Sequence, residues 1–342
     1  MLLPTRLLLA LLVNCSLALT MPDAGAANPR TFVASTGSDA NSCSLALPCR
    51  SFNVAIGKTN PGGEVVALDS AGYGTVTISG AITLAGPPGV QASITASVGR
   101  AVTVGAGASD RVVLRGLDIS TTGTATDGIE VLSAGEVVIE DCDISGVADY
   151  GIGFVGPGQL TVSRTRVSAS FNNIALGVFG SSGPARFVLE DSRLQVSGNG
   201  GGHAILAVDM VTGIIRNSAL LGTQSLGTYG VRVQGSAGKP VSIAVQKSLV
   251  ASHAYGIYAD GNSVSFGASV SLADSDISQN EFALQATSGG TIAVAASQVT
   301  HNSFGATADA TSFIFTDGRN FFGYNVSDLN GTTTLFGPIG IR

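Results

Sequence analysis

The sequence predicts an all-β protein, a right-handed parallel β-helix of roughly ten coils with a short N-terminal capping helix. The first observation is a frame, apolar-x-apolar-x-x-small-x-apolar, that recurs every 22 to 30 residues. The second is that each unit holds two or three short segments in which apolar and polar residues alternate, as they do in strands. The third is that Gly, Ser, Asn and Asp separate these segments, whereas no segment keeps a helical period.

The small position of the frame defines one column of the predicted solenoid. Its members are Cys142, Thr165, Ser192, Ser218, Ser248, Ser275 and Ser297. A single unit of this length cannot bury its own apolar face, but stacked units can, with equivalent positions about 4.8 Å apart. Connections between parallel strands are strongly biased to the right hand. We therefore expect these small residues to form an inward-facing row along a right-handed coil.

Composition restricts the partners. The chain has 342 residues, of which only 12% are charged, and a formal net charge of −6. A nucleic-acid partner is not expected from this charge. An anionic polysaccharide would need a local basic patch. The solenoid is expected to be a monomer, because one stack of coils can form a complete core.

The N-terminus predicts export. Residues 1–27 combine Arg6, the apolar stretch Leu7–Leu19 and small residues at 24–27, as signal peptides do. No later stretch is long enough to span a membrane. The mature protein is expected in the periplasm, at the cell surface or in the medium. In such an oxidising compartment Cys43 and Cys49 are expected to form a disulfide, the alternative being two free thiols.

The remaining chain divides into three parts. Residues 28–62 should form an N-terminal cap with a helix at about 50–59, residues 63–325 the β-helix, and residues 326–342 a C-terminal cover. A helix here would cover the open end of the first coil, whose apolar stack would otherwise face water.

Both ends of the mature chain resemble known proteins. TFVASTGSDANSC with the following PCRSFNVAIGKTNPGGEVVAL is similar to the N-terminal cap and first coil of bacterial exported members of the pectin-lyase-like superfamily, and FTDGRNFFGYNVSD is similar to their last coil. The resemblance implies a right-handed parallel β-helix. It does not imply one function, because the superfamily includes lyases, hydrolases, esterases, epimerases and non-catalytic surface proteins.

The motifs of the enzymes in this superfamily are absent. No Gly-His-Gly of the polygalacturonase-like members and no Asp-Pro-His of the epimerase-like members occurs. SFIFTDG approaches the Asp-Phe-Ile-Phe-Gly of the esterase-like members, but Ser312 stands where they have Asp. The leading hypothesis is therefore a non-catalytic exported protein that binds a polysaccharide or a cell-surface glycan. The alternative is a polysaccharide lyase that acts on an acidic glycan.

Charged residues beside the small column allow two interpretations. Equivalent positions hold Asp118, Asp143, Arg166 and Arg193 on one side, and Asp141, Arg164, Asp191, Asn217, Lys247 and Asp274 on the other. The signs largely alternate, which favours a ladder of ion pairs between coils. Under the lyase alternative, Asp118, Asp141 and Asp143 would bind calcium, and Arg164 or Arg166 would be the base. No other cofactor is expected.

Two more columns complete the predictions. Tyr150, Tyr229, Tyr255, Phe282 and Phe304 occupy one slot, and strand parity points them into the core, although a sugar-stacking platform is the alternative. Asn280 and Asn302 should begin a ladder of buried amides that satisfies turn backbone groups. Cys142 should be a buried, inert thiol.

Overall fold

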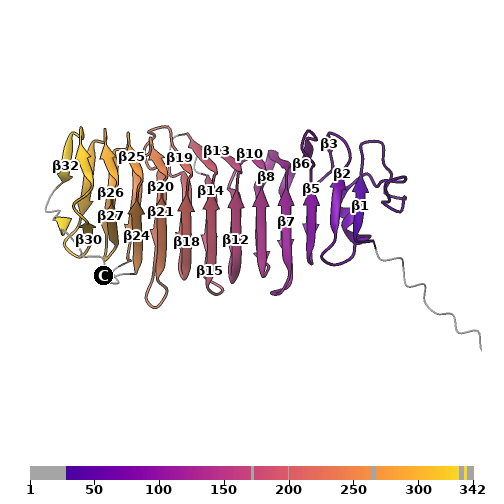
Figure 1. Cartoon of the computed structure of the whole chain (residues 1–342), viewed down its shortest axis with the longest axis horizontal. Helices are drawn as coiled ribbons and strands as arrows, with labels where there is room; N and C mark the ends of the chain where they lie inside the picture. The colour runs from indigo at the N-terminus through magenta and orange to yellow at the C-terminus, as the bar shows by residue number, and fades with distance from the viewer. Residues whose placement is uncertain (1–27, 171–172, 199, 263–266, 331–334, 337–342) are drawn as a thin grey trace, which may run out of the picture.

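The computed structural model describes residues 28–170, 173–198, 200–262, 267–330 and 335–336; the predicted signal peptide, 1–27, lies outside them. The protein is an elongated parallel β-solenoid of about ten turns (Figure 1). Each turn adds one strand to each of three parallel ladders, so the predicted parallel β-helix is confirmed. Within the described residues no helix is long and apolar enough to cross a membrane.

The first ladder forms one face of the solenoid and has thirteen described strands. They are β1 (Arg30–Val33), β2 (Glu64–Ala67), β5 (Ile82–Ala85), β7 (Arg111–Arg115), β9 (Glu136–Glu140), β12 (Gly158–Ser163), β15 (Ala185–Glu190), β18 (Val211–Arg216), β21 (Val241–Gln246), β24 (Ala268–Ala273), β27 (Thr291–Ala295), β30 (Phe313–Thr316) and β33 (Leu335–Phe336). In β18, residues alternate between buried and exposed along the strand, as expected for a sheet with one face in a core.

The second and third ladders share two long strands, β6 (Ala92–Gly105) and β8 (Leu117–Ser133), each of which passes from one ladder to the other. The rest of the second ladder is β3 (Ala71–Gly72), β10 (Asp143–Val147), β13 (Arg166–Ser170), β16 (Arg193–Ser197), β19 (Ala219–Leu221), β22 (Leu249–Ala251), β25 (Asp276–Ser278), β28 (Gln298–Thr300) and β31 (Phe321–Gly323). The rest of the third ladder is β4 (Val76–Ile78), β11 (Tyr150–Val155), β14 (Ile174–Phe179), β17 (His203–Val208), β20 (Tyr229–Gln234), β23 (Tyr255–Asp260), β26 (Phe282–Thr287), β29 (Phe304–Ala308) and β32 (Ser327–Asn330).

The C-terminal strands extend the ladders. β32 pairs with β29, and β33 pairs with β30. Ladder pairing therefore continues beyond residue 325, where the sequence analysis placed the beginning of the cover.

The small column forms the corner between the first and second ladders. At each corner one residue adopts a left-handed conformation, with φ of 47° at Arg164 and 50° at Asp191, and the next residue turns inward. The backbone N–H of each small residue donates to the side chain of the next coil, from Cys142 to Ser297, with distances of 3.1–3.3 Å. Each hydroxyl in turn donates to the carbonyl two residues earlier. This hydroxyl row satisfies buried polar groups that the tight turn would otherwise leave unpaired.

The predicted asparagine ladder forms the next corner, between the second and third ladders. The N–H of Asn280 donates to Oδ1 of Asn302 at 2.8 Å, and the N–H of Asn302 donates to Oδ1 of Asn325 at 2.9 Å. His253 takes the place of an asparagine one coil earlier: its ring nitrogen Nε2 lies 3.2 Å from the carbonyl of Leu220. The ladder is therefore confirmed, with a buried histidine at its N-terminal end.

The N-terminal cap closes the first coil. Helix α1 (Phe52–Gly57) is shorter than the predicted helix at about 50–59, and the hydroxyl of Ser51 accepts a hydrogen bond from the N–H of Val54 at its beginning. Phe52 is fully buried against Tyr73. The predicted disulfide between Cys43 and Cys49 is present in this segment, and Cys142 is buried and free, as predicted.

The predicted inward direction of the aromatic column is wrong. Tyr255 is half-buried, and its ring contacts Tyr258, which alternates outward along β23. The alternation breaks after Tyr255 because both Gly256 and Ile257 face the core. A Cβ on Gly256 would lie 2.7 Å from the carbonyl of Ala283, so only glycine fits this turn inward. The rings form an outer stack instead, with centroids of Tyr229 and Tyr255 4.7 Å apart.

Candidate ligand-binding groove

An open groove of about 720 Å³ follows the corner between the first and second ladders. It crosses four successive coils, from Arg164 to Leu249. In the first three of these coils three consecutive residues contribute: the left-handed turn residue lines one side, the hydroxyl residue lies between, and the first residue of the next strand lines the other side. In the fourth coil only the two side residues, Lys247 and Leu249, line the groove. Three strand spacings give the groove a length of about 14 Å along the solenoid axis.

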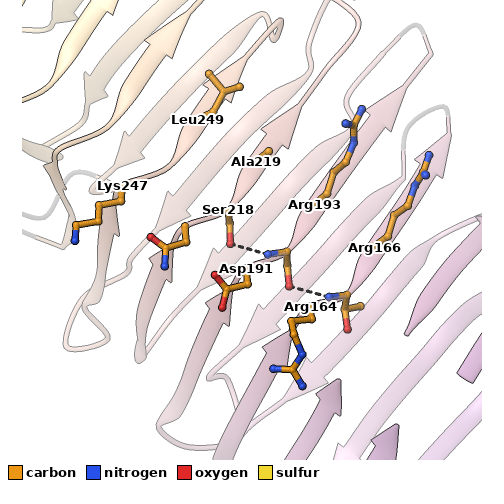
Figure 2. Close-up of a pocket in the computed structure, with 11 residues that line it drawn as sticks. Arg164, Arg166, Asp191, Arg193, Ser218, Ala219, Lys247 and Leu249 are labelled. Carbon is orange, nitrogen blue, oxygen red and sulfur yellow. Dashed lines mark hydrogen bonds between the residues drawn. The ribbon is translucent and has the colours of Figure 1, made fainter. Parts of the chain in front are cut away.

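The floor of the groove consists of buried members of the hydroxyl row. Thr165, Ser192 and Ser218 line it. The hydrogen bonds between coils, drawn as dashed lines in Figure 2, lie along the groove axis. Each hydroxyl of the floor already donates one hydrogen bond and accepts one within the protein. The floor therefore holds the side walls in place and offers few free polar groups to a ligand.

The walls are basic. Arg166 and Arg193 are register partners in β13 and β16, and their side chains extend in the same direction (Figure 2). Arg164, Asp191, Asn217 and Lys247 are the turn residues that form the other wall. The groove is thus lined by four cationic side chains and one carboxylate, in a protein whose formal net charge is −6. The wall residues are exposed except Ala219 and Leu249, which are half-buried.

Most of these cations have no ion pair. In the part of the chain that the structure describes, Arg166, Arg193 and Lys247 form none, and Arg193 only donates to the amide oxygen of Gln195 at 3.3 Å. By contrast, Arg111, Arg115 and Arg216 on the first ladder are paired with glutamates of neighbouring coils. In the two charged columns beside the hydroxyl row the predicted ladder is only partly present: Arg164 pairs with Asp141, whereas no ion pair joins Asp143 to Arg166.

Arg164 is the exception among the groove cations. Its Nε and Nη2 donate to the two carboxylate oxygens of Asp141 at 2.8 and 2.9 Å, and Nη2 also donates to Glu140 at 3.1 Å. These bonds lower the pKa of Asp141 and raise the pKa of Arg164 further. Arg164 is thus held as a cation at the N-terminal end of the groove and is a poor proton acceptor.

The remaining predicted site residues lie in one column. Asp118, Asp143 and Arg166 are register partners in β8, β10 and β13. Asp118 accepts a hydrogen bond from Gln91, and no ion pair joins Asp143 to Arg166. Asp141 lies on the other side of the hydroxyl row, paired with Arg164. The three predicted calcium ligands therefore lie on two sides of a corner, and no group of three potential metal ligands gathers among the described residues.

Arg193 and Lys247 belong to the charged columns of the repeat frame, but neither was predicted as a site residue. For Arg193 the signal in the sequence is a break in the alternation of charge sign. Arg166 and Arg193 are consecutive cations in one column, and the next two positions hold Ala219 and Leu249. No acidic residue follows them in that column until Asp276, which pairs in register with Leu249.

The comparisons with known proteins concern the fold. No family model matches the chain, and no curated protein matches it. Three solved structures are similar: pectate lyase Pel9A, with 14% identity over 89% of this chain and 81% of that one (TM-score 0.59); the A-module of mannuronan C-5 epimerase AlgE4 from Azotobacter vinelandii, with 14% identity over 82% and 91% (TM-score 0.56); and the Dettilon tailspike protein, with 10% identity over 90% and 68% (TM-score 0.53).

The chain has the right-handed parallel β-helix fold of the pectate lyases. Identities of 14% and below show this fold and no more. The resemblance deduced from the sequence is confirmed at this level. Two of these structures are named for an activity, a pectate lyase and a mannuronan epimerase, and those activities are properties of those proteins.

Proposed function

We propose that this protein is exported and binds an anionic polysaccharide in the basic groove, without chemical conversion. The observation that carries the proposal is the row of unpaired cations, Arg166, Arg193 and Lys247, in an otherwise acidic protein. An exposed cation cluster that the protein leaves without counter-charges raises the local concentration of anions. Guanidinium groups also bind carboxylates in a bidentate manner.

The shape of the groove favours a polymer. The cations recur along the solenoid axis at multiples of the strand spacing, about 4.8 Å. A chain of uronic acid units presents carboxylates at similar intervals, so several pairs can form at once, and each exposed pair needs to contribute only a few tenths of a kcal/mol. The disulfide between Cys43 and Cys49 fits a protein of an oxidising compartment, where such polymers occur.

Binding without conversion is favoured by the state of the candidate base. Arg164, one of the two predicted bases, is held by Asp141 and Glu140 as a cation. Asp118 and Asp143 lie in line with Arg166, on the side of the corner away from Asp141. The arrangement supplies charge complementarity to an anionic ligand but gathers no acid cluster around it.

The test is a calorimetric titration with polygalacturonate and, as neutral reference, with an uncharged galactan. We expect polygalacturonate to bind at low ionic strength and to weaken steeply as salt is added, since exposed pairs are screened. The uncharged galactan should show no binding in the same titration. Equal affinity for both polymers, or affinity independent of salt, would contradict the proposal.

The same samples test the lyase alternative. Prolonged incubation with polygalacturonate, with and without calcium, should release no unsaturated uronate, which absorbs in the ultraviolet. Release that is lost in Arg166→Gln would replace binding by β-elimination as the function of the groove.

A further inference from the structure

A second pocket, of about 440 Å³, lies over the corner between the second and third ladders, near the C-terminal end. We call it the Tyr324 pocket. The residues that carry its chemistry are Gln224, Glu281, His301, Ser303 and Tyr324. It belongs to the asparagine corner, whereas the basic groove belongs to the hydroxyl corner and to more N-terminal coils.

Two aromatic rings form one side of this pocket. His301 and Tyr324 occupy the left-handed turn position of consecutive coils, with φ of 58° and 57°. Their rings are stacked, with centroids 5.3 Å apart and planes inclined by 22°. Tyr324 is 76% exposed, so little of its ring is used for packing within the described residues.

Folding does not require aromatic residues at these positions. The buried Asn302 and Asn325 hold the turn through the amide ladder, and the residue before each of them only has to accept a left-handed backbone. Gly or Asn accepts this conformation most easily, and bulky residues rarely adopt it. Earlier coils have Ser252 and Gln279 there. The two rings thus occupy an unfavourable position and face the pocket, a combination that is typical of functional sites.

Three polar groups around the rings have no hydrogen-bond partner in the part of the chain that the structure describes. Among the described residues, the carboxylate of Glu281, the hydroxyl of Ser303 and the hydroxyl of Tyr324 form no hydrogen bond. Gln224 comes from the loop after β19, and its Nε2 donates to the carbonyl of Gln279 at 3.0 Å, which fixes this loop as a side wall. The pocket therefore combines a flat apolar surface with unpaired donors and acceptors.

We propose that the Tyr324 pocket binds a neutral sugar unit. The C–H face of a pyranose ring packs on the exposed face of the Tyr324 ring, and its hydroxyls donate to Glu281 and pair with Ser303. Aromatic rings with an apolar face and a polar rim suit such a ligand. An acidic sugar is excluded by the carboxylate of Glu281, because none of the described residues that line the pocket is Lys or Arg. The basic groove and the Tyr324 pocket thus select opposite classes of glycan.

The test uses saturation-transfer NMR with neutral β-linked oligosaccharides of glucose, galactose, mannose and xylose at millimolar concentration. At least one should bind, and Tyr324→Ala should weaken it about tenfold, the loss expected when one stacking ring is removed. Tyr324→Phe should bind almost as well, because the ring face remains. Glu281→Gln should bind more weakly while its circular dichroism stays unchanged.

The matched control is Val98→Ala in a distant coil. Val98 is 73% exposed, so its truncation also removes an exposed apolar side chain, and the variant should bind like the original protein. Arg166→Gln with Arg193→Gln should also leave neutral-sugar binding unchanged, so failure of the basic groove and failure of the Tyr324 pocket are separable. Binding of none of the four sugars, or equal binding by Tyr324→Ala and the original protein, would overturn the proposal.

Discussion

The hydroxyl of Ser218 accepts a hydrogen bond from the backbone N–H of Ser192 at 3.2 Å and donates one to the carbonyl of Arg216 at 2.8 Å. One side chain thus satisfies a donor in the preceding coil and an acceptor in its own. The same relationship repeats from Thr165 to Ser297, so the corner beneath the basic groove is a continuous buried network. Loss of one member leaves a buried N–H without an acceptor.

Ser218→Ala should lower the free energy of unfolding by about 1–3 kcal/mol, the usual cost of an unsatisfied buried polar group. Urea unfolding followed by circular dichroism measures the change. Ser242→Ala, at an exposed position of β21, is the control and should change stability by less than about 0.5 kcal/mol. Equal effects of the two substitutions would show that the network contributes nothing to stability.

Cys142 occupies the same column as Ser218 but should be chemically inert. Burial raises the pKa of its thiol to about 12, so almost no reactive thiolate exists near neutral pH. Iodoacetamide at neutral pH should therefore modify Cys142 only after denaturant has unfolded the protein, as followed by mass spectrometry. Rapid modification of the native protein would contradict the inward position of the side chain.

The buried histidine at the end of the asparagine ladder should make stability depend on pH. Burial lowers the pKa of His253 to about 4, whereas a histidine of the unfolded chain titrates near 6.5. Between these values the unfolded chain binds a proton that the folded protein does not. The free energy of unfolding should therefore fall as pH is lowered from about 6.5 towards 4, and this group adds no pH dependence above 6.5.

His253→Asn isolates this contribution. Asparagine is the residue that the same corner uses in later coils, so the variant should fold and lose part of the decrease in stability between pH 6.5 and 4. Burial also lowers the pKa of His203 to about 4, so a second decrease should persist in the variant. His301→Asn, at an exposed turn position, is the control. A pH profile of His253→Asn that coincides with that of the original protein would refute the assignment.

The repeat made the fold predictable. Small residues recur from Cys142 to Ser297 because each tight corner brings a side chain inward, where it accepts a hydrogen bond from the preceding coil; Asn320 takes this place in the next coil. The predicted direction of the aromatic side chains was wrong, because the prediction assumed that residues alternate between inward and outward without a break along each strand. Gly256 turns inward beside Ile257 and leaves Tyr255 outside. The same break follows Phe282, where Ala283 and Leu284 are both buried, so it belongs to the geometry of this ladder and not to one glycine.

The charged columns were predictable in position and only partly in pairing. Arg164 pairs with Asp141, its neighbour in the predicted column, and also with Glu140. Asp143 and Arg166 are register partners, as the repeat frame implied, yet no ion pair joins them. Long flexible side chains choose among several carboxylates by small differences in geometry, and sequence spacing does not contain these differences. The groove could not be predicted from the sequence, because it depends on which cations on the two sides of the hydroxyl row lack an ion pair.

The central claim, that the unpaired cations bind an anionic polysaccharide, is tested most directly by charge reversal. The double variant Arg166→Glu with Arg193→Glu is compared with Arg186→Glu, which also reverses an exposed arginine without an ion pair, on the first ladder outside the groove. The measurement is the calorimetric affinity for polygalacturonate at low ionic strength. We predict that the double variant loses binding while Arg186→Glu retains most of it. Arg186→Glu changes the net charge by half as much as the double variant, so a loss about half as large in free energy would mean that only net charge matters. Unchanged binding in the double variant would contradict the account.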